Sequence, residues 1–187
     1  VRVAGRGPVG YDVASIDVGI TAQMDVPGFA DHAVGAKPLD VYASRWRAFL
    51  ERVEGGAVAP EVVVIGGGVA GCELSMAMAH ALRDRGALPE VTVIEAGQQV
   101  SGLGDRARSH VLSAMRGLGV TLRTGVQVAR IEADRVVLGD GSSVPARFCV
   151  GAAGAFAHGW IFGTDLPQRD GFIKVGPDLG VMGDDRL

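Results

Sequence analysis

Three consecutive glycines interrupt an apolar run in residues 62–74, VVVIGGGVAGCEL. Gly66, Gly68 and Gly71 have the spacing Gly-x-Gly-x-x-Gly, and they lie between a strand-like run and a stretch with helical periodicity. In this context the first glycine permits a tight turn, the second lets the backbone approach a pyrophosphate, and the third lets the helix pack on the sheet. The pattern predicts dinucleotide binding, and the alternative is a tight turn that binds nothing. The candidate cofactor-binding residues of the loop, whose amides would hold phosphate charge, are Gly66, Gly67, Gly68, Val69, Ala70 and Gly71.

An acidic residue, Glu95, ends the next predicted strand, VTVIE at 91–95. It lies 24 positions beyond Gly71, close to the spacing of about 20 residues at which a carboxylate binds the adenosine ribose of NAD. Such a carboxylate would repel the 2′-phosphate of NADP, and residues 96–99 (AGQQ) supply no arginine to bind that phosphate. The sequence therefore predicts NAD(H) as the cofactor. Taken alone, such a residue would more often be an exposed acid at a strand end than a ligand.

The order of elements indicates how these residues are positioned. Helical periodicity covers residues 37–53, 70–84 and 105–118, and strand patterns occur at 11–18, 61–65, 91–95, 119–125 and 147–151. Between 126 and 147, short alternating runs broken by Asp, Gly and Pro are typical of an antiparallel meander. We therefore expect an α/β fold: a Rossmann-like three-layer parallel sheet with an antiparallel β-meander insertion.

Composition narrows the classes of function. With 18 basic and 21 acidic residues and a net charge of -3, no basic stripe favours a nucleic-acid partner. The four histidines lack metal-ligand spacing, so we expect no metal site. The two cysteines, Cys72 and Cys149, suit a reduced cytoplasmic protein. We expect Cys72 to be a small buried packing residue, and the alternative is a thiol activated by the start of the helix. No apolar run is long enough for a transmembrane segment.

Several of these stretches together resemble a known family. VVVIGGGVAGCEL, VTVIEAG, GVTLRTGVQVARIEADRVVLGDG and VGAAGA are similar to the NAD-binding half of the pyridine nucleotide-disulfide oxidoreductase superfamily. Type II NADH dehydrogenases look most similar, as does the flavoprotein module joined to selenide, water dikinase. YDVASIDVGITAQMDVPG and FIKVGPDLGV resemble segments of the family's FAD-binding domain.

The resemblance implies a domain organisation and further site residues. Residues 1–36 would be the C-terminal part of a split FAD-binding domain, 37–59 a connecting helix, 60–154 the NAD-binding domain, and 155–187 a return segment toward the FAD domain. Glu73 would be a catalytic residue near the nicotinamide and flavin, or simply an acid at a helix N-terminus. Ala153 and Gly154 match the strand end that approaches NAD, or form a glycine-rich turn.

The resemblance also implies a function and its alternatives. Nothing before Tyr11 matches the family's FAD glycine motif, so we expect the FAD to be held by a missing domain of the same polypeptide. The chain would position NADH for hydride transfer to that flavin, in the cytoplasm or at the surface of the inner membrane. Ala77 replaces a glutamate that type II NADH dehydrogenases tend to carry, which argues against a quinone-linked reaction.

Two alternatives remain. One is a non-catalytic regulatory or scaffold module fused to another enzyme such as selenide, water dikinase. The other is a sulfide:quinone reductase-like enzyme, which would need additional catalytic cysteines. Exposed apolar residues on the flanking segments would also favour a homo-oligomer. These residues are Ile16, Val18, Phe172 and Ile173.

Overall fold

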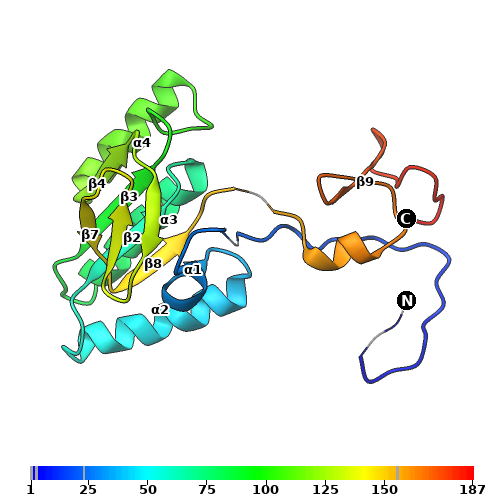
Figure 1. The fold of residues 1–187 in the computed structure, drawn as a ribbon, viewed down its shortest axis with the longest axis horizontal. Helices are drawn as coiled ribbons and strands as arrows, with labels where there is room; N and C mark the ends of the chain where they lie inside the picture. The colour runs from blue at the N-terminus through cyan, green and yellow to red at the C-terminus, as the bar shows by residue number, and fades with distance from the viewer. Residues whose placement is uncertain (1, 3, 23, 155) are drawn as a thin grey trace. The chain divides into compact units, whose positions relative to one another are not determined.

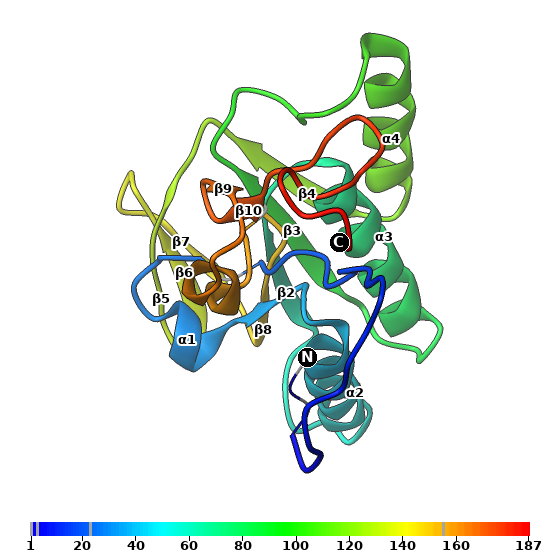
Figure 2. The ribbon, with the colours of Figure 1, turned by 90° about the vertical axis from the view of Figure 1, so that its right-hand side faces the viewer.

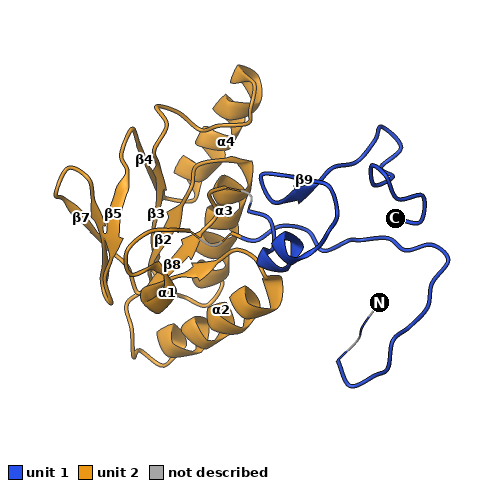
Figure 3. Cartoon of the chain, turned by 45° about the vertical axis from the view of Figure 1, so that its right-hand side comes forward, with its two compact units in different colours: residues 1–21, 156–187 blue, residues 22–155 orange. Residues whose placement is uncertain are grey.

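The structure is a computed structural model that describes residues 2, 4–22, 24–154 and 156–187. The chain divides into two compact units (Figure 3). One unit comprises residues 22–155, and the other combines residues 1–21 with 156–187. The 22–155 unit contains the glycine loop and all ten candidate site residues, so it positions the candidate site.

A five-stranded parallel sheet forms the centre of the 22–155 unit, in the order β1-β8-β2-β3-β4 (Figure 1). Its strands are β1 (Val34–Gly35), β2 (Glu61–Ile65), β3 (Glu90–Glu95), β4 (Val120–Thr124) and β8 (Phe148–Gly151). Ile65 at the end of β2 is in register with Ile94 on one side and Gly151 on the other. The carboxyl ends of β2, β3 and β8 therefore meet where the strand order changes direction, which is where open α/β sheets bind ligands.

Three helices cover one face of this sheet: α2 (Leu39–Glu54), α3 (Val69–Arg83) and α4 (Asp105–Gly117). Because side chains alternate along a strand, Val62 and Val64 of β2 belong to the core on this face, where Met78 and Leu82 of α3 are fully buried. Each buried aliphatic side chain of this kind stabilises the fold by about 1.5–3 kcal/mol. The apolar spacing of the helices is thus what fixes them to the sheet.

The opposite face is covered by an antiparallel meander and one short helix, α1 (Phe29–His32). The meander consists of β5 (Val128–Ile131), β6 (Arg135–Leu138) and β7 (Ser143–Pro145). Val63 and Ile65 of β2 pack in the core on this side with Val136 of β6. In Figure 2 the meander lies on one side of the parallel strands, and α3 and α4 lie on the other. The predicted fold class is confirmed.

The predicted strand at 11–18 is wrong. These residues, all of which the structure describes, form no strand, and Val13 is 76% exposed. Ala14 N–H donates to the carbonyl of Arg186 at 2.8 Å, and the ring of His158 bonds to the carbonyl of Val18 at 3.0 Å. A strand needs a ladder of such bonds, which alternation in the sequence cannot supply by itself. Among the described residues, the regular elements of the unit formed by residues 1–21 and 156–187 are η1 (Gly159–Gly163), β9 (Gln168–Arg169) and β10 (Phe172–Ile173).

Candidate functional site

The glycine loop turns the chain from β2 into α3 in the space of three residues. Gly66 has φ +112°, a conformation that residues with a side chain rarely adopt, and its N–H donates to the carbonyl of Ile94 at 2.8 Å. A Cβ at Gly66 would lie 2.7 Å from the backbone nitrogen of Ala153. The first glycine is therefore required both by the turn and by the close approach of the segment that follows β8.

Gly71 lets α3 pack directly onto this turn. It is buried in the first turn of the helix, and a Cβ there would collide with the carbonyl oxygen of Gly66. Because that obstacle is backbone, it cannot move aside as a flexible side chain could. The motif predicts that this glycine lets the helix pack close to the sheet, and the close contact between Gly71 and the Gly66 carbonyl agrees with that role.

Glu95 is tied to the same loop by hydrogen bonds. Its Oε2 accepts from the N–H of Gly67 at 2.6 Å, and its Oε1 accepts from the N–H of Gly97 at 2.7 Å. A Cβ at Gly67 would lie 2.7 Å from the Cβ of Glu95, so the middle glycine makes room for this side chain. Glu95 is thus partly buried and paired, unlike a simple exposed acid at a strand end. Each carboxylate oxygen still has capacity for another donor.

The start of α3 is open in front of the loop. Gly68 has extended backbone angles (φ -73°, ψ 177°), and no side chain caps the helix there. A Cβ at Gly68 would meet only the Ser101 hydroxyl, at 3.6 Å, so space exists for a ligand to approach the backbone. The first amides of the helix, including Val69 and Ala70, have no intrahelical acceptor and carry partial positive charge. These residues fit the phosphates of a dinucleotide.

A cavity of about 230 Å³ lies at the carboxyl ends of β2 and β3 and beside the segment that follows β8. It brings together three of the predicted residues, Gly66, Glu95 and Ala153. The walls that sequence reasoning missed are mostly apolar: Met24, Val26, Ala96, Val126, Gln127 and Val128. Residues 126–128 could have been found, because they follow β4 and the carboxyl ends of parallel strands share one edge. A carboxylate among apolar walls suits a ribose with an attached flat ring.

The other predicted residues lie around this cavity rather than in its wall. Glu73 is the exposed fifth residue of α3, and the first turn of that helix contains no acid. Its interpretation as an acid at the helix N-terminus is therefore wrong, while its catalytic role stays a prediction. Gly154 is exposed, and its φ of +77° is a conformation that residues with a side chain rarely adopt, so glycine is favoured at this turn.

Both thiols lie in environments that disfavour the thiolate. Cys72 is fully buried, and its Sγ lies 3.8 Å from the carbonyl oxygen of Gly67. Burial raises the pKa of the Cys72 thiol, and the carboxylates of Glu95 and Glu73 raise it further. Burial also raises the pKa of Cys149, to about 12. A packing role for Cys72 therefore fits better than an activated thiol.

The described residues contain no group of three or more His, Cys, Asp or Glu side chains that could hold a metal ion.

Thiol labelling tests the packing role of Cys72. At pH 8 we expect both cysteines of the folded chain to react with a chromogenic disulfide at least about 100-fold more slowly than in denaturant, because raised pKa values leave little thiolate and burial blocks access. The measurement is the rate of thiol release with and without guanidinium. Rapid reaction of one thiol in the folded chain, abolished in Cys72→Ala, would show that Cys72 is an activated thiol after all.

The sequence profile of the pyridine nucleotide-disulphide oxidoreductase family matches residues 19–181, most of the chain. The chain belongs to this family. The resemblance seen in the sequence to this family is thereby confirmed. Proteins of the family are oxidoreductases that bind FAD and NAD(P)H. Among the described residues, none of the helices is both long and apolar enough to cross a membrane.

Individual members of the family to which the chain is similar include NADH dehydrogenase-like proteins. An NADH dehydrogenase-like protein of Mycobacterium tuberculosis is 33% identical over 171 residues, covering 84% of this chain and 42% of that protein. A mitochondrial internal alternative NAD(P)H-ubiquinone oxidoreductase of Solanum tuberosum is 31% identical over 121 residues, covering 60% of this chain and 24% of that protein. NDH2 of Plasmodium falciparum, solved with NADH, shares the fold, with a TM-score of 0.74 at 17% identity over 89% of this chain and 40% of that one. The chain thus spans less than half the length of these relatives.

Proposed function

We propose that residues 60–154 bind NADH and hold its nicotinamide for hydride transfer to a flavin. The observation that carries this proposal is the placement of Glu95, whose carboxylate lines the cavity at the strand ends and is fixed by the amides of Gly67 and Gly97. A carboxylate held in this way is pre-oriented, so little conformational freedom is lost when a ligand binds. NADH supplies the hydride chemistry, and the protein supplies orientation.

The glycine loop and the Glu95 carboxylate would bind different parts of the dinucleotide. Because the Gly67 N–H is already donated to Glu95, the amides available for a pyrophosphate are those of Gly68, Val69 and Ala70. The remaining acceptor positions of Glu95 would receive the two hydroxyls of the adenosine ribose. A 2′-phosphate would bring negative charge against this carboxylate, so NADH is preferred over NADPH.

The other end of the dinucleotide would pass the segment after β8. Ala153 packs against Gly66, and Gly154 carries no side chain, so a cofactor could lie close to the backbone there. Glu73 is exposed on α3, where its carboxylate is free to contact the nicotinamide or the flavin side of the reaction. We therefore retain Glu73 as the candidate catalytic residue and Ala153 and Gly154 as cofactor-binding residues.

The flavin, as FAD, would be held by a domain to which the flanking segments contribute. Of the expected residues 1–36 and 155–187, we exclude residues 22–36, because α1 and β1 belong to the 22–155 unit. This assignment is supported by the relatives, which are more than twice as long as the matched part of this chain. Apolar side chains on these segments are partly exposed, Ile16 at 37%, Val18 at 45% and Phe172 at 40%. Such a surface suits a covering partner, either further chain of the same protein or a second copy.

Calorimetric titration tests the proposal. We expect the chain to bind NADH at least about tenfold more tightly than NADPH, because a close pair of like charges costs more than 1 kcal/mol. FAD, titrated separately, serves as the control for general dinucleotide binding. Equal affinity for NADH and NADPH, or binding of FAD alone, would contradict the assignment. Binding of none of the three would favour the non-catalytic scaffold module instead.

A further inference from the structure

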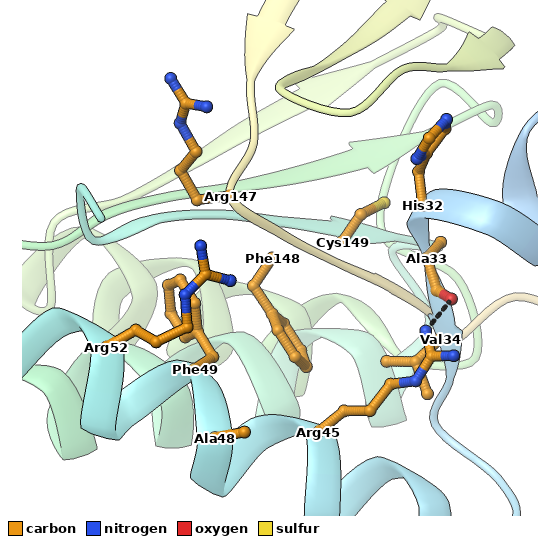
Figure 4. A pocket seen from close by; sticks show the side chains of 10 residues that line it. All are labelled: His32, Ala33, Val34, Arg45, Ala48, Phe49, Arg52, Arg147, Phe148 and Cys149. Carbon is orange, nitrogen blue, oxygen red and sulfur yellow. Dashed lines mark hydrogen bonds between the residues drawn. The ribbon is translucent and has the colours of Figure 1, made fainter. Parts of the chain in front are cut away.

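A second cavity, of about 260 Å³, lies at the other edge of the 22–155 unit, between α2 and the strands β1 and β8. None of its lining residues also lines the cavity that contains Glu95. Its rim carries three guanidinium groups: Arg45 and Arg52 from α2 and Arg147 just before β8. Figure 4 shows Arg45 and Arg52 directed from α2 toward the strand residues, with the ring of Phe148 between them.

Positive charge in this cavity is only partly compensated. Arg147 Nε pairs with Glu61 Oε2 at 3.4 Å, and Arg45 Nη1 donates to the carbonyl of Ala33 at 3.1 Å. Among the described residues, neither Arg45 nor Arg52 has an ion pair, and no carboxylate lines the cavity. A guanidinium has five donors, so Arg45 keeps most of its donors after its bond to Ala33. His32 also lines the cavity, from α1.

The floor of the cavity is apolar. Phe49 and Phe148 are buried beneath the arginines, with ring centroids 5.2 Å apart, and the side chain of Ala48 lies between Arg45 and Arg52 on α2. Arg45 and Arg52 are separated by seven positions, about two helical turns, so both project from the same face of α2. Two forked donors above an aromatic floor match a flat group that carries an oxyanion, since guanidinium groups bind phosphate and carboxylate bidentately.

We propose that this cavity binds a small organic anion in which a phosphate or carboxylate is attached to a flat apolar group. The oxyanion contacts Arg52 and Arg45, and the flat group lies over Phe148. The site is separate from the dinucleotide site, so both can be occupied at once. This inference does not depend on the proposed NADH function.

Backbone-amide spectra of the isotope-labelled chain, titrated with phenyl phosphate, test the proposal. We expect saturable shifts in α2 and at residues 147–149, unaltered by prior addition of NADH, and weaker binding as salt rises, because exposed charges are screened. Benzyl alcohol, which keeps the ring but lacks the anion, should give no saturable shifts. Sodium benzoate serves to compare a carboxylate with a phosphate.

Two matched variants test whether an arginine of the cavity contributes to phenyl phosphate binding. Arg52→Gln should weaken phenyl phosphate binding about fivefold to tenfold, as expected for loss of a partly screened charge-assisted hydrogen bond. Arg47→Gln, on the same helix but outside the cavity, should leave the affinity unchanged. Circular dichroism checks that both variants keep their helix content. Equal weakening in both variants, saturable binding of benzyl alcohol, or shifts that map elsewhere would overturn the proposal.

Discussion

Replacement of Gly71 by alanine is expected to lower the free energy of unfolding by about 3 kcal/mol, because the new Cβ collides with the backbone carbonyl of Gly66. Helix propensity alone predicts the opposite sign, since alanine is favoured over glycine inside a helix by about 1 kcal/mol. The shift of α3 needed to relieve the collision would also move the amides in front of the loop. NADH affinity should therefore fall together with stability.

The matched control is Gly117→Ala, a second helical glycine. Gly117 lies in the last turn of α4, and a Cβ there would meet nothing within 4 Å. This variant should be unchanged or stabilised by up to about 1 kcal/mol. Chemical denaturation followed by circular dichroism gives both values. If Gly71→Ala were as stable as Gly117→Ala and bound NADH normally, the close packing of α3 on the glycine loop would be wrong.

Substitution of Glu95 by glutamine is expected to weaken NADH binding about tenfold while changing NADPH binding much less. The amide retains one acceptor oxygen and the shape of the side chain, but it loses the negative charge that discriminates against a 2′-phosphate. Its NH₂ group also cannot accept from the N–H of Gly67 or Gly97, one of which loses its partner. The preference for NADH over NADPH should therefore narrow.

The pattern of affinities separates two roles of Glu95. If Glu95→Gln lowered both affinities equally, the carboxylate would support the loop without contacting the ribose. If neither affinity changed, the assigned adenosine pocket would be wrong. Glu90→Gln, at the exposed amino end of the same strand, is the control and should bind both cofactors as the unaltered chain does. Calorimetry supplies all the affinities.

Most helices and strands of the fold could be predicted from the local periodicity of apolar residues. The strand at 61–65, the helix after Gly68 and the strand at 91–95 were predictable because a buried parallel strand is uniformly apolar and an amphipathic helix repeats every 3.6 residues. The segment 11–18 failed because its alternation is real but a strand also needs a partner, which no local pattern reveals. The same limit applies wherever pairing is decided far along the chain.

The candidate site was predictable in part for a similar reason. Gly66, Gly71 and Glu95 follow from a motif whose geometry is local, and Cys72 was correctly weighed as a packing residue. The bonds from Gly67 and Gly97 to Glu95 depend on how the loop after β3 folds back, which the sequence does not specify. The cavity lined by Arg45, Arg52 and Arg147 arises only when α2 packs beside β8.

A crystal structure of the chain grown with NADH tests the central claim most directly. Our account predicts the adenosine ribose hydroxyls within hydrogen-bond distance of the Glu95 carboxylate, and the pyrophosphate at the amides of Gly68, Val69 and Ala70. The bonds from Gly67 and Gly97 to Glu95 should persist in the complex. A dinucleotide bound away from this loop, or one whose ribose lies beyond reach of Glu95, would contradict the account.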